Sequence, residues 1–182
     1  MAKAIGMVEF VSIARGIYVA DQMVKISDVE IVTSSSTCPG KYITIVHGDV
    51  AAVETSVALG EKLAGEYFVD SIVIANVHPG VFPTITGACM PDKVQAIGVV
   101  ESFSMSTMII AADAILKSAE LESIELRLGN GLGGKAFFVF TEDVAAVETG
   151  VDAGKKIAIE KGLLVDTEVI PSPSELFIPS LL

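Results

Sequence analysis

The chain contains the same sequence twice, and this internal repeat limits its fold more than any other feature. The block AIGMVE at residues 4–9 returns as AIGVVE at residues 96–101, 92 positions later. The block DVAAVET at residues 49–55 returns unchanged at residues 143–149, 94 positions later. A two-residue insertion in the second copy explains the difference. This period is longer than those of the common solenoid repeats, so the sequence predicts two copies of one small domain.

Both copies predict the same order of elements: strand, helix, two strands, helix and strand. The first helix of each copy carries apolar residues spaced by four, three and four positions, and such a stripe packs one helix face on a sheet. The stripe residues are Ile13, Ile17, Ala20 and Val24 in the first copy and Met105, Ile109, Ala112 and Leu116 in the second. The expected fold is of the α/β (α+β) class, two tandem domains that each have a small, mainly antiparallel four-stranded sheet covered by helices.

The remaining elements follow from apolar runs and from helix-start signals. Asp49 and Asp143 stand where an N-cap carboxylate accepts backbone N–H bonds, and Val50, Val53 and Val57 form the buried side of the helix that follows Asp49. The predicted strands cover residues 5–10, 29–33, 41–46 and 72–75, then 97–103, 123–128, 136–140 and 163–169.

A connector separates the two copies. Residues 79–93 hold three prolines and two glycines, a composition typical of turns and loops. We therefore place the first domain with its connector at residues 1–91 and the second domain at residues 92–182.

The composition favours a protein with extensive subunit interfaces. Hydrophobic residues other than glycine make up 51% of the chain, and the mean hydropathy is +0.62. Small domains bury a smaller share of their surface than large ones, and large exposed apolar patches promote association. No apolar run reaches the roughly 18 residues of a membrane-spanning helix, and the N-terminus lacks signal-peptide features, so a cytoplasmic protein is expected. The net charge of −11 opposes nucleic-acid binding.

The loop after the second strand of each copy is the candidate functional feature. The first loop reads SSSTCPG at residues 34–40, and the second reads GNGLGG at residues 129–134. Both leave room for a close backbone approach to another chain or a ligand, because glycine tolerates unusual dihedral angles. Only the first loop carries a thiol, Cys38.

A single cysteine is most often a small apolar filler, and a zinc or iron–sulfur site takes three or four ligands. A homotrimer changes this count. Three copies of Cys38 near a threefold axis would supply three thiolates and leave one coordination position for solvent or another ligand.

The repeat also carries a family resemblance. The AIGMVE opening, the helix ends Ala20-Asp21-x-x-x-Lys25 and Ala112-Asp113-x-x-x-Lys117, and the Gly-Lys pairs before a strand resemble the shell domain of bacterial microcompartments, twice over essentially the whole chain. Within that family, the TCPGK and GLGGK segments that end at Lys41 and Lys135 are similar to the tandem-domain proteins of the propanediol-utilisation type. The resemblance implies a structural protein and not an enzyme.

The family implies a homotrimer that forms a flat pseudohexamer, tiles with other shell proteins and encloses metabolic enzymes in a cytoplasmic compartment. It further implies that Cys38 of three subunits binds one 4Fe-4S cluster per trimer at a central pore. Electron transfer across the shell, or cluster delivery to encapsulated redox enzymes, would follow. The implied pore residues are Ser36, Thr37, Pro39, Gly40, Gly131, Leu132, Gly133 and Gly134, and the implied shell-edge lysines are Lys25 and Lys117.

Two other functions remain open at the level of sequence. One is a regulatory module that binds a small ligand between tandem α/β domains. The other is a shell protein whose pore conducts metabolites and carries no cluster. Cys89, His47 and His78 lack partners at metal-ligand spacing, and the recurrence of Glu9 at Glu101 is explained by the duplication alone.

Overall fold

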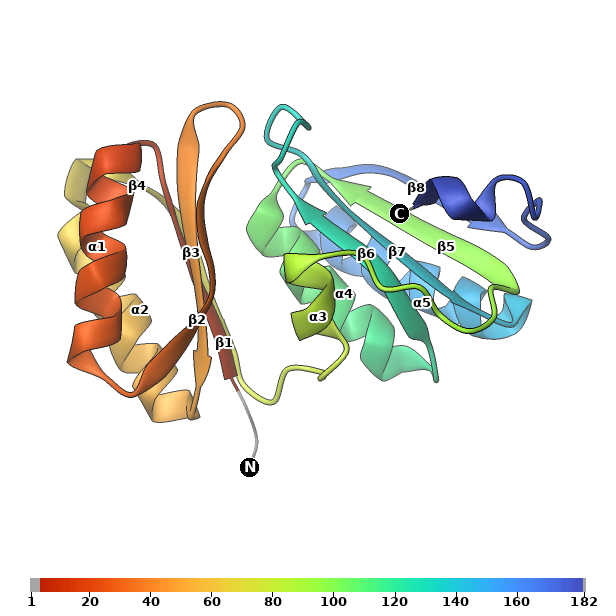
Figure 1. Cartoon of the computed structure of the whole chain (residues 1–182), viewed down its shortest axis with the longest axis horizontal. Helices are drawn as coiled ribbons and strands as arrows, with labels where there is room; N and C mark the ends of the chain where they lie inside the picture. Colours follow the sequence, from red (N-terminus) through yellow and green to blue (C-terminus); the bar gives the residue numbers. More distant parts are fainter. Residues whose placement is uncertain (1–3, 182) are drawn as a thin grey trace. The chain divides into compact units, whose positions relative to one another are not determined.

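A computed structural model describes residues 4–181 of the chain. The chain divides into two compact units, Met1–Val77 and His78–Leu182. Each unit consists of a four-stranded antiparallel sheet with two helices on one face, labelled in Figure 1. The expected fold class is confirmed.

The first unit has the strand order β2-β3-β1-β4, with antiparallel pairing between all neighbours. Helices α1 and α2 cover one face of this sheet (Figure 1). The elements are β1 Ala4–Phe10, α1 Ile13–Ile26, β2 Val29–Thr37, β3 Lys41–Gly48, α2 Val50–Ala64, the 3-10 turn η1 Gly65–Tyr67 and β4 Phe68–Ile74.

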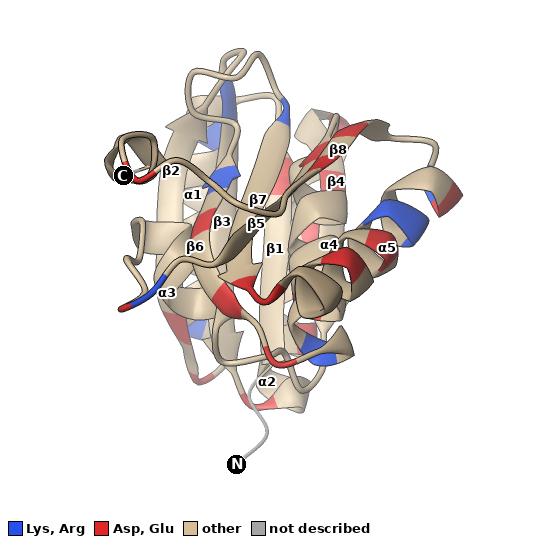
Figure 2. Cartoon of the chain, turned by 90° about the vertical axis from the view of Figure 1, so that its right-hand side faces the viewer, with Lys and Arg blue, Asp and Glu red and all other residues tan. Residues whose placement is uncertain are grey.

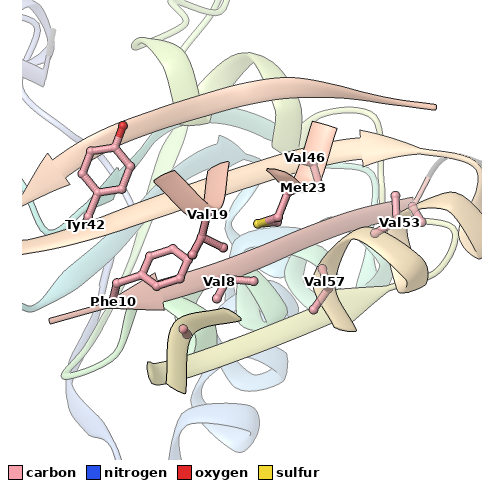
Figure 3. Close-up of a cluster of buried hydrophobic side chains, with 10 residues drawn as sticks. Val8, Phe10, Val19, Met23, Tyr42, Val46, Val53 and Val57 are labelled. Carbon is pink, nitrogen blue, oxygen red and sulfur yellow. The ribbon is translucent and has the colours of Figure 1, made fainter. Parts of the chain in front are cut away.

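The core of this unit lies between the sheet and its two helices. Figure 3 shows side chains from β1, α1 and α2 pointing into one apolar layer. Val8, Phe10, Val19, Met23 and Val53 are fully buried there. Burial of such a side chain contributes roughly 1.5–3 kcal/mol, so this layer holds the helices on the sheet.

The second unit repeats the arrangement with the strand order β6-β7-β5-β8. Helices α4 and α5 cover its sheet (Figure 1), and the short helix α3 packs on β6 and α4. The elements are α3 Val81–Thr86, β5 Ala96–Ser102, α4 Met105–Ser118, β6 Glu122–Leu128, β7 Ala136–Glu142, α5 Val144–Glu160, β8 Leu164–Ile170 and the 3-10 turn η2 Ile178–Leu181.

The predicted apolar stripe is confirmed in the second copy and only in part in the first. All four stripe residues of α4 are buried, whereas in α1 Ile13 is 42% and Ile17 is 55% exposed. The buried residues of α1 are Gly16, Val19, Ala20 and Met23, so Ala20 of the predicted stripe is buried, and Val24 is partly buried against the same core. Apolar periodicity identifies the apolar face of a helix, but it does not show whether that face packs on the unit's own sheet or lies at the surface.

The helix-start signals are confirmed in part. Asp143 accepts a bond of 2.8 Å from the backbone N–H of Ala146, as an N-cap carboxylate does. Asp49 stands at the N-cap of α2, but its side chain makes no capping bond to the described helix, so that predicted bond is wrong. The buried side of α2 is correct, with Val53 and Val57 in the core and Val50 partly buried against it.

The connector between the two repeats packs with the second compact unit. The predicted division followed residue 91, whereas the compact units divide between Val77 and His78. The connector joins the second unit because its helix α3 packs on β6, and because the backbone N–H of Cys89 donates to Ile124 O at 2.7 Å.

Candidate functional site

Cys38 lies in a three-residue turn at the end of the β2–β3 hairpin. Thr37 pairs with Lys41 across the hairpin, so Cys38, Pro39 and Gly40 form the turn. The peptide bond between Cys38 and Pro39 is cis, and Gly40 has a φ of +77°. A left-handed glycine in a three-residue hairpin loop is a common turn geometry. Cys38 is half-buried and Gly40 has open space around it, so the tip of the turn is accessible.

The polar run before Cys38 belongs to strand β2, which corrects the expected loop over residues 34–40. The strand continues through Ser34 to Thr37 because these residues pair with β3 in register. Ser34 Oγ lies 3.1 Å from both Tyr42 Oη and Thr44 Oγ1, which satisfies the hydroxyls inside the hairpin. Small polar side chains therefore do not prevent strand pairing here.

Thr37 differs from the other hydroxyl residues of this strand. Its side chain is 5% exposed, and its Oγ1 finds no hydrogen-bond partner among the described residues. A buried hydroxyl without a hydrogen-bond partner lowers stability. Such a group often marks a position where a water molecule, an ion or a partner group supplies the missing hydrogen bond. Ser36, by contrast, is exposed.

The turn is anchored to the first strand by an ion pair. Lys41 Nζ lies 2.7 Å from Glu9 Oε1, and the Glu9 side chain is 5% exposed. The second copy repeats the pair between Lys135 and Glu101 at 2.5 Å. The duplicated glutamates therefore hold the base of each hairpin turn. The sequence contained this signal as a strand glutamate and a Gly-Lys pair in both copies, but the pairing itself was not predicted.

The second loop connects β6 to β7 and has no thiol. Gly129, Gly131, Gly133 and Gly134 all have positive φ values between +62° and +92°. Side chains rarely adopt this conformation, so glycine is required at these positions. A Cβ at Gly131 or Gly133 would meet no atom within 4 Å, so the tip stands open. Leu132, the one large side chain of the implied pore set, is half-buried.

The implied edge lysines both stand in the last turn of their helices. Lys25 Nζ bonds Asp21 Oδ2 at 2.5 Å, and Lys117 Nζ bonds Asp113 Oδ2 at 2.6 Å. The two pairs differ in exposure: the Asp21 side chain is 51% exposed and that of Asp113 only 11%. Each lysine is thus held along the helix by the aspartate of its Ala-Asp-x-x-x-Lys motif.

One chain alone cannot build a metal site from these groups. Among residues 4–181, no three His, Cys, Asp or Glu side chains group closely enough to hold an ion. Both cysteines are free and half-buried. His47 Nε2 faces Glu30 at 3.5 Å, and His78 Nδ1 accepts the backbone N–H of Gly80 at 3.2 Å. A cluster bound by Cys38 would therefore need ligands from further chains, and the accessible thiol on this anchored turn fits that role.

The surface charge and the helix lengths add two further findings. Figure 2 shows Lys and Arg scattered among Asp and Glu, not gathered in one basic stripe. None of the helices between residues 4 and 181 is long and apolar enough to span a bilayer.

Comparison with known proteins decides the family. The BMC domain profile matches residues 4–77 and again residues 96–173. The chain belongs to the BMC domain family. It is a bacterial microcompartment shell protein of the tandem-domain type, as the sequence resemblance predicted, and the family is structural and not enzymatic.

Individual relatives match this chain over nearly its whole length. The microcompartment shell protein PduT of Citrobacter freundii is 41% identical over 175 residues, which cover 96% of this chain and 95% of PduT. A crystal structure of a microcompartment protein from Desulfitobacterium hafniense is 44% identical, with a TM-score of 0.93 over 97% of this chain and 98% of that chain. The fused permuted hexameric shell protein MSM0275 shares the fold, with 17% identity and a TM-score of 0.64 over 87% of this chain and 82% of that one. These findings decide against a soluble regulatory module.

Proposed function

We propose that the chain forms a homotrimeric, pseudohexameric shell tile in which Cys38 of three subunits binds one 4Fe-4S cluster at a central pore. The observation that carries this proposal is the position of Cys38. It is the one thiol on either hairpin turn, and its turn is accessible and anchored by the Glu9–Lys41 pair. An anchored turn supports cluster binding because its thiolate loses less conformational freedom when the metal binds.

The trimer supplies what one chain lacks. Cluster sites in proteins are usually completed by four ligands, most often thiolates. Three identical turns around a threefold axis offer three thiolates, and the fourth position is left for a ligand that is not a cysteine of this turn. The six BMC domains of three tandem chains would alternate around the ring, which gives the tile its pseudohexameric outline.

The residues around Cys38 have roles of their own in this proposal. Thr37 Oγ1, buried and without a partner among the described residues, is available to donate a hydrogen bond when the turn is completed by its neighbours. Pro39 has no backbone N–H, so residue 39 cannot donate a backbone hydrogen bond to the sulfur of Cys38. A bound cluster would take up and release single electrons, and hydrogen bonds and solvent exposure would set its potential. Electron transfer across the shell is the function this supports.

The second turn would complete the pore wall without binding metal. Gly131, Gly133 and Gly134 with Leu132 supply backbone and one aliphatic side chain, and no sulfur. The chemical asymmetry between the two turns is what allows three thiolates, and not six, to meet in a pseudohexamer.

The test is anaerobic purification followed by iron and sulfide analysis of three proteins: the natural chain, Cys38→Ser and Cys89→Ser. We expect about one cluster per three chains in the natural protein and in Cys89→Ser, and no iron in Cys38→Ser. The native mass of Cys38→Ser should remain that of a trimer. Iron retained by Cys38→Ser would refute the ligand assignment. An iron-free natural protein that stays iron-free after anaerobic reconstitution would favour a metabolite-conducting pore.

We further propose that the compartment is of the propanediol-utilisation type, which the identity with PduT along nearly the whole chain supports. Compartments isolated from the native host should then convert 1,2-propanediol. Compartments that contain this chain and leave that substrate unchanged would contradict the assignment.

A further inference from the structure

The segments that follow the fourth strand of each copy are equivalent to each other. Ile74 pairs with Ile5 at the end of β4, and Ile170 pairs with Ile97 at the end of β8. Counted from these ends, the residue matching Val81 is Phe177. By the same count Pro83 matches Pro179, so α3 and the η2 turn correspond. Both segments lie outside the family match, which stops at residues 77 and 173.

The segment of the first copy is firmly bound to the second unit. Helix α3 packs on β6 and α4, and its residues Val81 and Thr84 are 0% and 1% exposed. Two hydrogen bonds fix its beginning: the backbone N–H of His78 donates to Asp113 Oδ1 at 2.7 Å, and Ser123 Oγ donates to Gly80 O at 2.9 Å. The α4–β6 surface is therefore a binding surface for such a segment.

The segment of the second copy displays its apolar side chains instead. Leu176 is 94% exposed and Phe177 is 43% exposed, although the residue matching Phe177 in the first copy is fully buried. The far end of the segment is held, because Leu181 packs on the cluster of Ile97, Ile124 and Val139. Adjacent exposed apolar side chains of this size indicate a surface that another molecule covers.

The first copy presents the matching receiving surface. Asp113 and Ser123 correspond to Asp21 and Ile31, because Ser123 pairs with Phe140 as Ile31 pairs with Val46. Asp21 has a side-chain exposure of 51%, and Ile31 is 47% exposed.

The bonds on the two aspartates show which oxygen would receive the segment. The bonds to Asp21 from Lys25 and Gln22 both end on Oδ2. In Asp113 the lysine also bonds Oδ2, and it is Oδ1 that receives the backbone N–H of His78. In the first copy the lysine is thus bound to Oδ2 of Asp21, as in the second copy, and Oδ1 of Asp21 is the equivalent of the oxygen that accepts the backbone N–H of His78.

We propose that residues 174–180 of one chain dock on the α1–β2 surface of a second copy of the chain, as α3 docks on α4 and β6. In this arrangement the backbone N–H of Ser174 donates to Asp21 Oδ1, and Leu176 lies on Ile31. The inference rests on the proposed trimer. In a closed ring of three tandem chains, the repeat after the second copy is the first copy of the next chain, and such head-to-tail contacts close into rings.

An engineered disulfide tests the docking in the full chain. A Cβ at Gly80 would lie 3.4 Å from Ser123 Oγ, which is compatible with disulfide geometry, so the equivalent positions Leu176 and Ile31 are suitable sites. Leu176→Cys and Ile31→Cys are combined in a background in which Cys38 and Cys89 are serine. After mild oxidation we expect most chains to run as covalent dimers and trimers on a non-reducing gel.

The matched control replaces Ile31→Cys by Ile159→Cys, on a different helix, α5, with a similar exposure of 55%. It should yield no covalent ladder. A ladder of equal strength from the control would contradict the docking, as would an oxidised pair within single chains.

Native mass separates this inference from the proposed function. A protein that is trimeric by native mass but forms no bond between chains through residues 31 and 176 would overturn the docking and leave the tile intact. A monomeric native mass without covalent dimers would overturn both.

Discussion

Helices α1 and α4 have the same origin, the same serine N-cap and the same Asp-x-x-x-Lys ending, yet they lie in different environments. α4 buries ten of its residues, whereas α1 buries four. Ile109 is fully buried in α4, and its counterpart Ile17 is 55% exposed in α1. Duplication preserved the apolar stripe in both helices, but the single chain covers all of it only in the second. This difference is what we expect if Ile13 and Ile17 contact another chain in the proposed trimer.

The largest expected effect concerns the stripe itself. Ile109→Asp places a charge in a fully buried site, so it should destabilise the second unit by about 4 kcal/mol or more in urea unfolding. Ile17→Asp should change the unfolding free energy by less than about 0.5 kcal/mol. It should weaken trimer association roughly tenfold, which corresponds to about 1.4 kcal/mol, in sedimentation experiments. Equal effects on unfolding would remove the distinction between the helices.

One pair of contacting core residues has its large and small members exchanged between the two copies. Gly16 lies against Tyr42 in the first copy, where a Cβ would approach Tyr42 to 2.6 Å, and the equivalent pair in the second copy is Met108 with Ala136. Tyr42→Ala should cost about 3 kcal/mol through the cavity it leaves, and Gly16→Met about 1–3 kcal/mol through overpacking.

The double variant Gly16→Met/Tyr42→Ala copies the pair of the second unit. It should recover at least about 1 kcal/mol relative to the sum of the single changes in urea unfolding. If the unfolding free-energy changes of the two single variants simply add, the two positions do not pack as a pair in the way that Met108 and Ala136 do.

The third prediction compares the motif aspartates. Asp113→Ala removes the acceptor of the His78 backbone N–H and of Lys117, so urea unfolding of the second unit should become easier by about 2 kcal/mol. Asp21→Ala breaks only an exposed pair, and its cost to unfolding should stay under about 0.5 kcal/mol. Asp21→Ala should also weaken the bond between residues 31 and 176 of neighbouring chains. Undiminished cross-linking would show that this carboxylate does not receive the segment.

The smallest difference is expected for the ion pairs below the turns. Glu9 has 5% of its side chain exposed and Glu101 has 28%. Glu9→Gln should therefore cost about 1 kcal/mol and Glu101→Gln less than about 0.5 kcal/mol, measured as thermal shifts at matched ionic strength. Glu9→Gln should also loosen cluster retention because Lys41 follows the Cys38 turn directly. A larger cost for Glu101→Gln would contradict the exposures.

The sequence predicted the repeat, the element order and the position of the turns, because these depend on local patterns that both copies share. It misjudged the burial of Ile13 and Ile17 in α1, since burial depends on what covers a helix and not on its periodicity. It also ended β2 too early: Ser34, Ser35 and Ser36 are not among the residues that favour strands, yet their pairing with β3 keeps them in the sheet. The fate of the connector likewise depended on a tertiary contact, the packing of α3 on β6.

The residue types drew attention to the two turns, through Cys38 in the first and the glycines at residues 131, 133 and 134 in the second. Their pore role came from the family resemblance and stays a prediction. The Glu9–Lys41 anchor joins residues 32 positions apart, and no local pattern specifies that pairing. The exposure of Leu176 and of Asp21 became informative only when the burial of the two copies could be compared residue by residue.

Native mass spectrometry of anaerobically purified protein tests the central claim most directly, because it weighs the assembly and its bound group together. We expect one dominant species, three chains plus four iron and four sulfide, and the same trimer without that added mass for Cys38→Ser. An iron-bearing monomer, or a trimer of the natural protein that never carries iron even after reconstitution, would contradict it.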